Sequence, residues 1–259
     1  MKIGIIPSSI SEKDIGLKDI ISIPDKFQSE YRSEYPNLVF NQHDGQMCMA
    51  CSISLIRHIQ LYRRYGLDIL PDILYIYSKR DNDMYQGNEM IPKEALTSIV
   101  KYGIPEIISD KEKYLSTFSK YDYNDAKKLY KDKEVEILDR DKVIGYYKLS
   151  TPEEIKTAIL NFGTVTAVFR DNESLYYPKV VADIRAYIDY SKYTDNTTCK
   201  GHHQMTIIGW RNNNWIVQNS WGEFYGLNGV VHIPFEYPII EAWAIIDKDD
   251  DNQFGIFSK

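Results

Sequence analysis

The sequence has few cysteines, no long apolar run and no long apolar core at its N-terminus, and each of these features excludes a class of protein. The 259 residues include only three cysteines, Cys48, Cys51 and Cys199, and so small and odd a number excludes a secreted disulfide framework. No apolar run approaches the ~18 residues of a transmembrane helix, and the stretch before Pro7 is shorter than the ~7-residue minimum for the core of a secretory signal. We therefore expect an intracellular, cytoplasmic protein, with a viral particle as the alternative location.

Excess positive charge is also lacking. The formal net charge is −6, whereas a protein that binds nucleic acid or an anionic membrane needs a basic face. We expect neither partner. With 43% hydrophobic and 26% charged residues, the chain has the composition of a globular protein, and its length suits one domain of two lobes.

A helix is predicted over residues 51–65. Apolar residues recur there at helical spacing, Arg63 and Arg64 occupy the last turn, and Gly66 follows as a stop signal. Cys51 therefore stands at or near the amino end of a helix, where the positive end of the helix dipole favours a thiolate.

The rest of the chain divides into a helical part and a part rich in strands. Further helices are predicted from Pro71, over 92–102 and in "STPEEIKTAIL", and the charged segment 108–142 is predicted as a surface connection. Short β-branched or aromatic runs then follow: "TVTAVF", "QMTIIGW", "WIVQN", "GVVHI" and "AWAII". The fold class is therefore α+β, with a helical lobe at about 41–120 and a β-rich lobe at about 121–259.

The C-x-x-C formed by Cys48 and Cys51 has several interpretations. Zinc could be held by Cys48, Cys51, Cys199 and either His202 or His203. A thioredoxin-like pair would need a βαβ unit around it, which residues 20–50 do not supply. The cysteines could also be buried thiols that only pack.

A nucleophilic cysteine is favoured by the second half of the chain. His203 starts one predicted strand and Asn219 ends the next, so antiparallel pairing can bring the two side chains together. A cysteine nucleophile needs an imidazole to take its proton and a polar group that orients the imidazole.

The chain resembles the papain-like, cathepsin-type cysteine peptidases. "CMACS" is similar to the family's C-G-S-C-W, "HHQMTIIGW" to D-H-A-V-x-x-V-G-Y, and "QNSWGEFYGLNGVVHI" to K-N-S-W-G-x-x-W-G-x-x-G-Y-x-x-I. The resemblance begins near Ile23 and includes "YQGNEMIPKEALTSIVKYGI", which is similar to the family's substrate-cleft segment and the helix that follows it.

The resemblance implies a two-lobed fold with the active site between the lobes. It makes Cys51 the nucleophile, His203 the base and then the acid, and Asn219 the orienting amide. Trp221 would shield the hydrogen bond between Asn219 and His203 from water. It also implies a resting ion pair of thiolate and imidazolium, and peptide hydrolysis that needs a reduced thiol but no cofactor and no metal.

This sequence departs from the family pattern at several positions. "LVFNQ" resembles the family's "PVKNQ", which makes Gln42 the expected oxyanion-hole residue and Gln46 the alternative. Ser52 replaces the family's tryptophan after the nucleophile, and no cysteine between Cys51 and Cys199 can pair with Cys48 in the cleft. A bond between Cys48 and Cys199 remains an alternative to a free Cys48. Expected substrate-binding residues are Gly87, Met90 and Gln204.

Residues 1–22 precede the expected peptidase domain at 23–259. We interpret them as an extension, a short pro-segment that lies over the cleft. The first hypothesis is thus a cysteine peptidase that acts on peptides or proteins. The alternatives are a catalytically weak relative that binds peptides or proteins, and a related thiol enzyme such as an amidase or transpeptidase.

Overall fold

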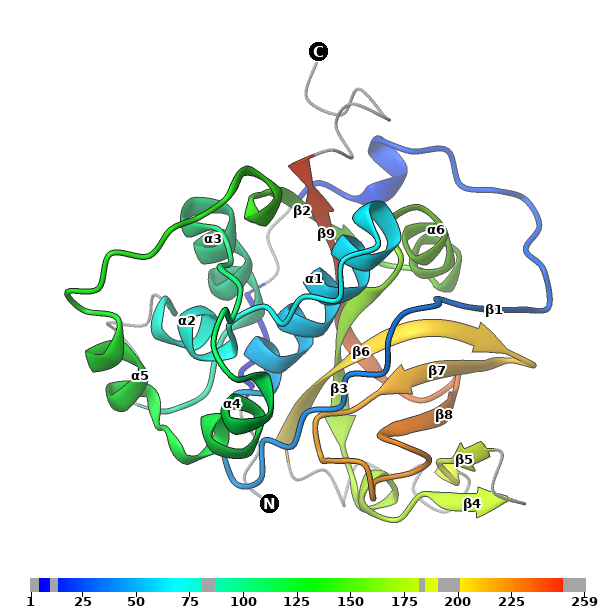
Figure 1. Cartoon of the computed structure of the whole chain (residues 1–259). Helices are drawn as coiled ribbons and strands as arrows, with labels where there is room; N and C mark the ends of the chain where they lie inside the picture. The colour runs from blue at the N-terminus through cyan, green and yellow to red at the C-terminus, as the bar shows by residue number, and fades with distance from the viewer. Residues whose placement is uncertain (1–4, 10–13, 81–86, 182–184, 191–200, 249–259) are drawn as a thin grey trace.

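A long central helix organises the molecule. The structure is a computed structural model that describes residues 5–9, 14–80, 87–181, 185–190 and 201–248. Its helix α1 (Cys48–Tyr65) lies between the other helices of the first half and the β-sheet (Figure 1). The residues from Cys48 to Leu61 are all buried, so α1 is surrounded by protein over most of its length.

The ends of α1 follow from local chemistry. Gly66 has a φ of 67° and its N–H donates to the Tyr62 carbonyl at 2.8 Å, which confirms the predicted helix stop. The helix begins at Cys48, three residues earlier than the sequence indicated, so Cys51 is its fourth residue.

The remaining helices of the first half lie on the side of α1 away from the sheet (Figure 1). They are α2 (Ile73–Ser78), α3 (Pro92–Tyr102), α4 (Lys111–Thr117) and α5 (Tyr123–Leu129). The described residues also form short 3-10 turns: η1 (Leu17–Asp19), η2 (Phe118–Lys120), η3 (Asp139–Asp141) and η4 (Glu173–Tyr176). The prediction for α3 is confirmed at both ends. Helix α2 begins two residues after Pro71 because the Asp72 carboxylate caps it by accepting from the Tyr75 N–H at 3.1 Å.

The segment 108–142 is more than a surface connection. It contains α4 and α5, and it buries Phe118, Ala126 and Tyr130 in the same apolar core as α1. These buried residues are far apart in a charged stretch, so they produce no periodic signal in the sequence. That part of the prediction was wrong.

Nine strands of the described residues form one sheet. The order is β2-β9-β3-β6-β7-β8-β5-β4, with β1 paired to β6. The bounds are β1 (Glu30–Arg32), β2 (Val143–Leu149), β3 (Val165–Asp171), β4 (Lys179–Val181), β5 (Arg185–Tyr187), β6 (Gly201–Arg211), β7 (Asn214–Gln218), β8 (Val230–Pro234) and β9 (Ile239–Asp247). The five predicted strands are confirmed as β3, β6, β7, β8 and β9, whereas β1, β2, β4 and β5 were not anticipated.

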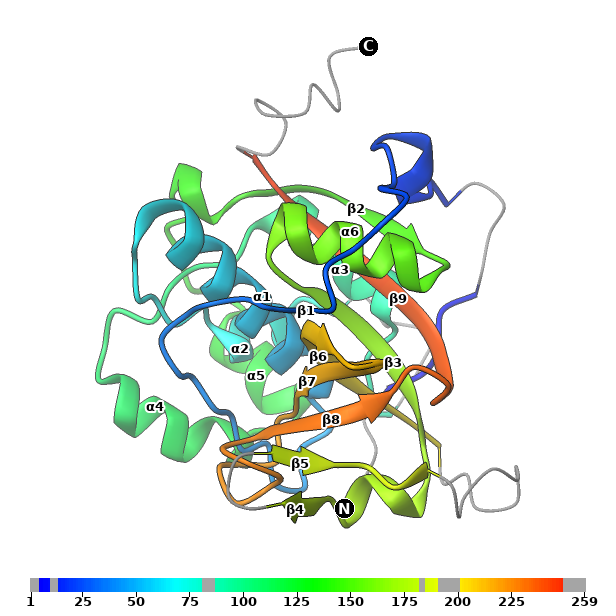
Figure 2. The same ribbon diagram turned by 90° about the vertical axis from the view of Figure 1, so that its right-hand side faces the viewer.

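The two faces of the central strands pack against different helices. Thr166 on β3 and Thr206 on β6 reach the Ser52 hydroxyl of α1, at 2.7 and 2.8 Å. On the other face, Ile207 of β6 shares a core with Ile159 of α6 (Pro152–Phe162), which Figure 2 shows lying over the sheet. The helices of the first half are segregated from a largely antiparallel sheet formed mainly by the second half, which confirms the α+β class.

The helices of the described residues do not include one that could cross a membrane. The boundary between the two lobes, predicted at about residue 120, remains a prediction. The core around α1 takes residues from both halves of the chain, among them Ile76 and Trp243.

Candidate active site

Cys51 lies in the first turn of α1. Its backbone N–H donates to the Met47 carbonyl at 2.9 Å, and only 1% of the residue is exposed. Cys51 is a free thiol in the structure. Burial raises the pKa of this thiol well above its ordinary value, and the neighbouring Cys48 raises it further. Burial thus opposes the helix dipole and favours the protonated thiol.

His203 and Asn219 meet as the spacing between them predicts. The strands β6 and β7 pair antiparallel, with Thr206 opposite Gln218. This register brings the His203 Nε2 atom to 2.7 Å from the Asn219 Oδ1 atom.

The orientation of the Asn219 amide fixes the histidine tautomer. The Ser220 backbone N–H, which can only donate, lies 2.7 Å from Asn219 Oδ1. That atom is therefore the oxygen, and His203 Nε2 must carry the proton that Oδ1 accepts. The Nδ1 atom of a neutral His203 ring is left as the basic nitrogen.

Burial also controls the charge of His203. The residue is 1% exposed. Burial lowers the pKa of His203 to about 4, while the hydrogen bond with Asn219 acts in the opposite direction. The ring is therefore neutral at pH 7. The effects of burial on His203 and Cys51 both favour the neutral forms, so a resting ion pair would have to gain more from mutual attraction than burial costs.

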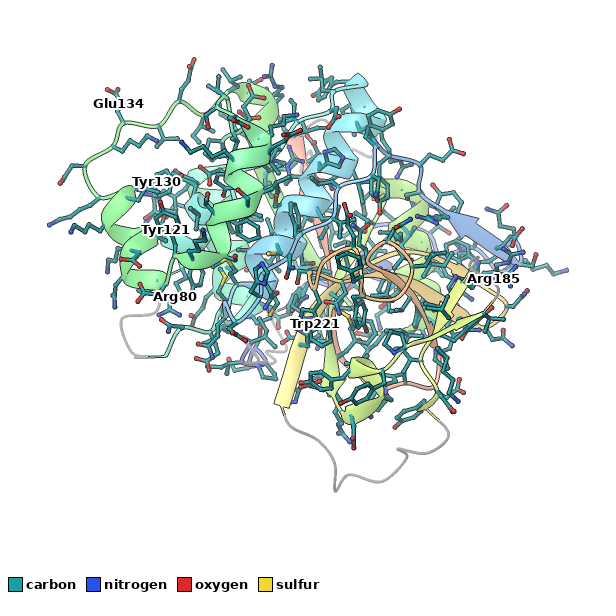
Figure 3. All side chains as sticks on the ribbon, turned by 60° about the horizontal axis from the view of Figure 1, so that its bottom comes forward. Arg80, Tyr121, Tyr130, Glu134, Arg185 and Trp221 are labelled. Carbon is teal, nitrogen blue, oxygen red and sulfur yellow. The ribbon has the colours of Figure 1, made fainter. Side chains whose placement is uncertain are left out.

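Trp221 covers the histidine ring. The two rings stack with centroids 4.5 Å apart, and the opposite side of Trp221 stacks on Tyr176 at 5.2 Å. In Figure 3, Trp221 lies where the helical half meets the sheet. Sequence reasoning missed Tyr176, because nothing in its local pattern marks it as part of the site.

The two candidate oxyanion-hole glutamines lie in different surroundings. Gln42 is buried beside Ser220: its N–H donates to the Ser220 carbonyl at 2.8 Å, and its Oε1 accepts from the Ser220 hydroxyl at 2.5 Å. Its Nε2 donates to the Gly45 carbonyl at 2.7 Å. Gln46 instead donates to the Glu89 carboxylate at 3.1 Å. Gln42 is thus adjacent to the His203–Asn219 pair, and Gln46 faces the segment at Glu89.

A close chain contact keeps Gln42 in this place. Asn41 forms an isolated antiparallel bridge with Trp221. Gly222 has a φ of 85°, and a Cβ atom there would come within 2.9 Å of the Asn41 side chain. Only glycine suits this backbone and this approach.

Residues 87–91, which we call the cleft segment, contact the described N-terminal residues. Ile5 pairs in parallel with Met90, and the Ile6 N–H donates to the Met90 carbonyl at 3.0 Å. Further along, the Ser8 N–H donates to the Glu241 carboxylate at 2.7 Å. Met90, an expected substrate-binding residue, is fully buried here, and Gly87 is partly exposed.

Gln204 lies behind the site. It is 1% exposed, and its amide nitrogen donates to the Thr166 hydroxyl. Together with Cys51 and Asn219 it lines a small pocket of about 10 Å³, enough for about one water molecule. A larger cavity of about 440 Å³ opens beside the loop before α1, lined by residues of 43–46 and 116–122 together with Tyr77 and Asn88.

The zinc interpretation receives no support from the described residues, which contain no group of three His, Cys, Asp or Glu side chains placed to hold a metal. Cys199, which both that interpretation and the Cys48–Cys199 bond require, lies outside the described residues.

Comparison with known proteins establishes the family. The model of the papain family cysteine proteases matches residues 88–237, more than half of the chain. The chain belongs to this family, and the expected family, enzyme class and papain-like fold are confirmed. The matched region includes His203 and Asn219 but begins after Cys51. No sequence among curated proteins matches the chain.

Solved structures share the fold. Xylellain, a cysteine protease from Xylella fastidiosa, is 16% identical with a TM-score of 0.69, covering 94% of this chain and 95% of its own. Procathepsin B S9 from Trypanosoma congolense is 15% identical with a TM-score of 0.67, covering 95% and 86%. The digestive procathepsin L 3 of Tenebrio molitor larval midgut is 14% identical with a TM-score of 0.62, covering 88% and 72%.

Proposed function

We propose that the chain hydrolyses peptide bonds with Cys51, His203 and Asn219 as its catalytic triad. The hydrogen bond of 2.7 Å between His203 and Asn219 carries this proposal, because it leaves His203 Nδ1 as the base. The position of Cys51 in the first turn of the central helix supports its role as nucleophile. The substrate would be a peptide or protein.

The reaction follows from these roles. His203 Nδ1 takes the Cys51 proton, and the thiolate attacks the carbonyl carbon of the scissile peptide bond. The Gln42 amide would donate to the oxyanion that forms. The imidazolium then gives its proton to the departing amine, which leaves a thioester on Cys51. Water, deprotonated by His203, hydrolyses the thioester and releases the carboxylic acid.

We further propose that residues 5–9 act as the chain's own partner in the cleft. Their contacts with Met90 and Glu241, together with the burial of Cys51, support a closed state. Burial that keeps both thiol and imidazole neutral fits such a state. Displacement of the segment would admit substrate and restore water near the pair. An intracellular location is part of the proposal and accords with the free thiol of Cys51.

One experiment separates this function from its alternatives. The wild-type chain, Cys51→Ala and His203→Ala would each be incubated under reducing conditions with a mixture of peptides, and the products identified by mass spectrometry. We expect peptides cleaved to free carboxylates by the wild type alone. Transfer to an added amine would indicate a transpeptidase. Binding of peptides without any turnover would favour the catalytically weak relative, for which the buried Cys51 is the main argument.

A further inference from the structure

The cleft segment is held by two side chains that donate hydrogen bonds to its backbone carbonyl groups. The Arg80 guanidinium donates to the carbonyl of Gly87 and, at 2.5 Å, to that of Glu89. The Tyr77 hydroxyl donates to the carbonyl between them, that of Asn88, at 2.6 Å. Three consecutive carbonyl groups are thus fixed by two side chains.

Arg80 itself is fixed by aromatic rings. It is 5% exposed, and its guanidinium carbon lies 3.7 Å from the centroid of the Tyr123 ring and 5.8 Å from that of Tyr77. The Tyr123 hydroxyl donates to the Arg80 carbonyl at 3.3 Å. Figure 3 shows Arg80 on the helical side of the molecule. A buried cation between ring faces is held more firmly than one in water.

This arrangement determines which backbone groups of the segment remain for an incoming chain. The carbonyls of residues 87–89 accept from Arg80 and Tyr77, whereas the Met90 carbonyl accepts from the backbone N–H of Ile6. A substrate that displaces residues 5–9 would find the Met90 carbonyl as a ready acceptor for backbone pairing. The position of that acceptor depends on the fixed carbonyls before it.

No disulfide can replace these contacts, because the chain has no cysteine between Cys51 and Cys199. Lysine could not replace Arg80 either. The guanidinium is a planar fork that donates in two directions at once, whereas an ammonium is a single point charge.

We propose that Arg80, with Tyr77, is a positioning residue that holds the cleft segment where the backbone of a substrate peptide can pair with Met90. This inference rests on the proposed peptidase function for the identity of the incoming chain, but the positioning itself does not depend on catalysis.

The test compares Arg80→Lys and Tyr77→Phe with Arg57→Lys in the full-length chain. Arg57 is the matched control, since it is also a buried arginine that donates to a backbone carbonyl, that of Arg140, at 2.8 Å, but its ion pair is with Asp247, away from the cleft segment. The first readout is hydrogen exchange of peptides covering residues 87–91. We expect exchange at least about tenfold faster in Arg80→Lys, a smaller increase in Tyr77→Phe and no change there in Arg57→Lys.

The second readout is a ratio of two labelling rates at Cys51, with a peptidyl epoxysuccinate that needs the cleft and with iodoacetamide that needs only the thiol. Arg80→Lys should lower this ratio at least about tenfold, and Arg57→Lys should leave it unchanged. Equal exchange in Arg80→Lys and wild type would overturn the proposal, whatever Cys51 does. Failure of the epoxysuccinate to label Cys51 in the wild type and also in Ile6→Pro, which removes the N–H that pairs residues 5–9 with Met90, would contradict the proposed function. With the exchange difference intact, that result would leave the positioning role standing.

Discussion

The sheet side and the helix side of the candidate active site are held by different kinds of contact. On the sheet side, strand pairing between β6 and β7 places His203 and Asn219, and ring stacking on Trp221 covers them. On the helix side, Arg80 and Tyr77 donate to the backbone of the cleft segment. The Met90 carbonyl of that segment accepts from the Ile6 N–H. Backbone register fixes one side, and individual side chains fix the other.

This difference teaches where the site can change. A register slip would move every side chain of β6 to the opposite face, so the sheet side is rigidly specified. The helix side depends on a few side-chain hydrogen bonds to the backbone of residues 87–89 and on the pairing of Ile6 with Met90. We therefore expect substitutions on the sheet side to abolish chemistry, as would substitution of the nucleophile Cys51 itself. Substitutions in the cleft segment and its supports should instead change access and binding.

The largest expected effect is on the sheet side. His203→Ala removes the group that takes the thiol proton, and kcat should fall by a factor on the order of 10⁴. The measurement is steady-state hydrolysis of a peptide found to be cleaved by the wild type. A fall of less than about tenfold would mean that another group is the base.

The next largest effect is expected at one of the two glutamines that could complete the oxyanion hole. Gln42→Ala should lower kcat/KM by about 100- to 1000-fold, the usual cost of one oxyanion donor. Gln46→Ala is the matched control, and because its amide donates to Glu89 it should have a much smaller effect. The reverse order would assign the oxyanion hole to Gln46.

A smaller effect is expected from the N-terminal segment. Ile6→Pro removes the N–H that donates to the Met90 carbonyl, so residues 5–9 should release the cleft and peptide turnover should rise about threefold to tenfold, since a net hydrogen bond is worth about 1 kcal/mol. Ile6→Ala keeps the N–H and serves as the control. Equal turnover in Ile6→Pro and wild type would show that the segment does not close the site.

The last effect is on stability rather than on turnover, and it concerns the neutral His203. Its pKa is about 4 in the folded chain against an ordinary value of 6.5, so the unfolded chain binds more protons between these pH values. The free energy of unfolding should therefore fall as the pH drops from 6.5 to 4, by about 1.4 kcal/mol per pH unit from this group. Urea titrations of His203→Gln should show a flatter pH dependence than those of the wild type.

The sheet side was largely predictable from the sequence. The strands carry β-branched runs between turns, and the spacing of His203 and Asn219 needs only antiparallel pairing to bring them together. The stop at Gly66 and the span of α3 also follow from local signals. These features depend on neighbours in sequence or on one strand pair.

The helix side was harder to predict, for a physical reason. Nothing in the local sequence distinguishes Arg80 from an arginine at the surface. Its hydrogen bonds to the carbonyls of Gly87 and Glu89 exist only in the folded chain. The near-complete burial of Cys51 and Met90 likewise results from chains that meet across long sequence separations. A resting thiolate was expected from the helix position of Cys51 and from the family resemblance, whereas burial raises the pKa of the thiol.

The central claim is that Cys51 is the activated nucleophile of a peptide cleft. The most direct measurement is labelling of the full-length chain by a peptidyl epoxysuccinate under reducing conditions, with the adduct mapped by mass spectrometry. We predict a single adduct on Cys51, formed faster in Ile6→Pro and lost in His203→Ala. If Cys51 reacts no faster than Cys48 or Cys199 in Ile6→Pro as well as in wild type, the claim is contradicted.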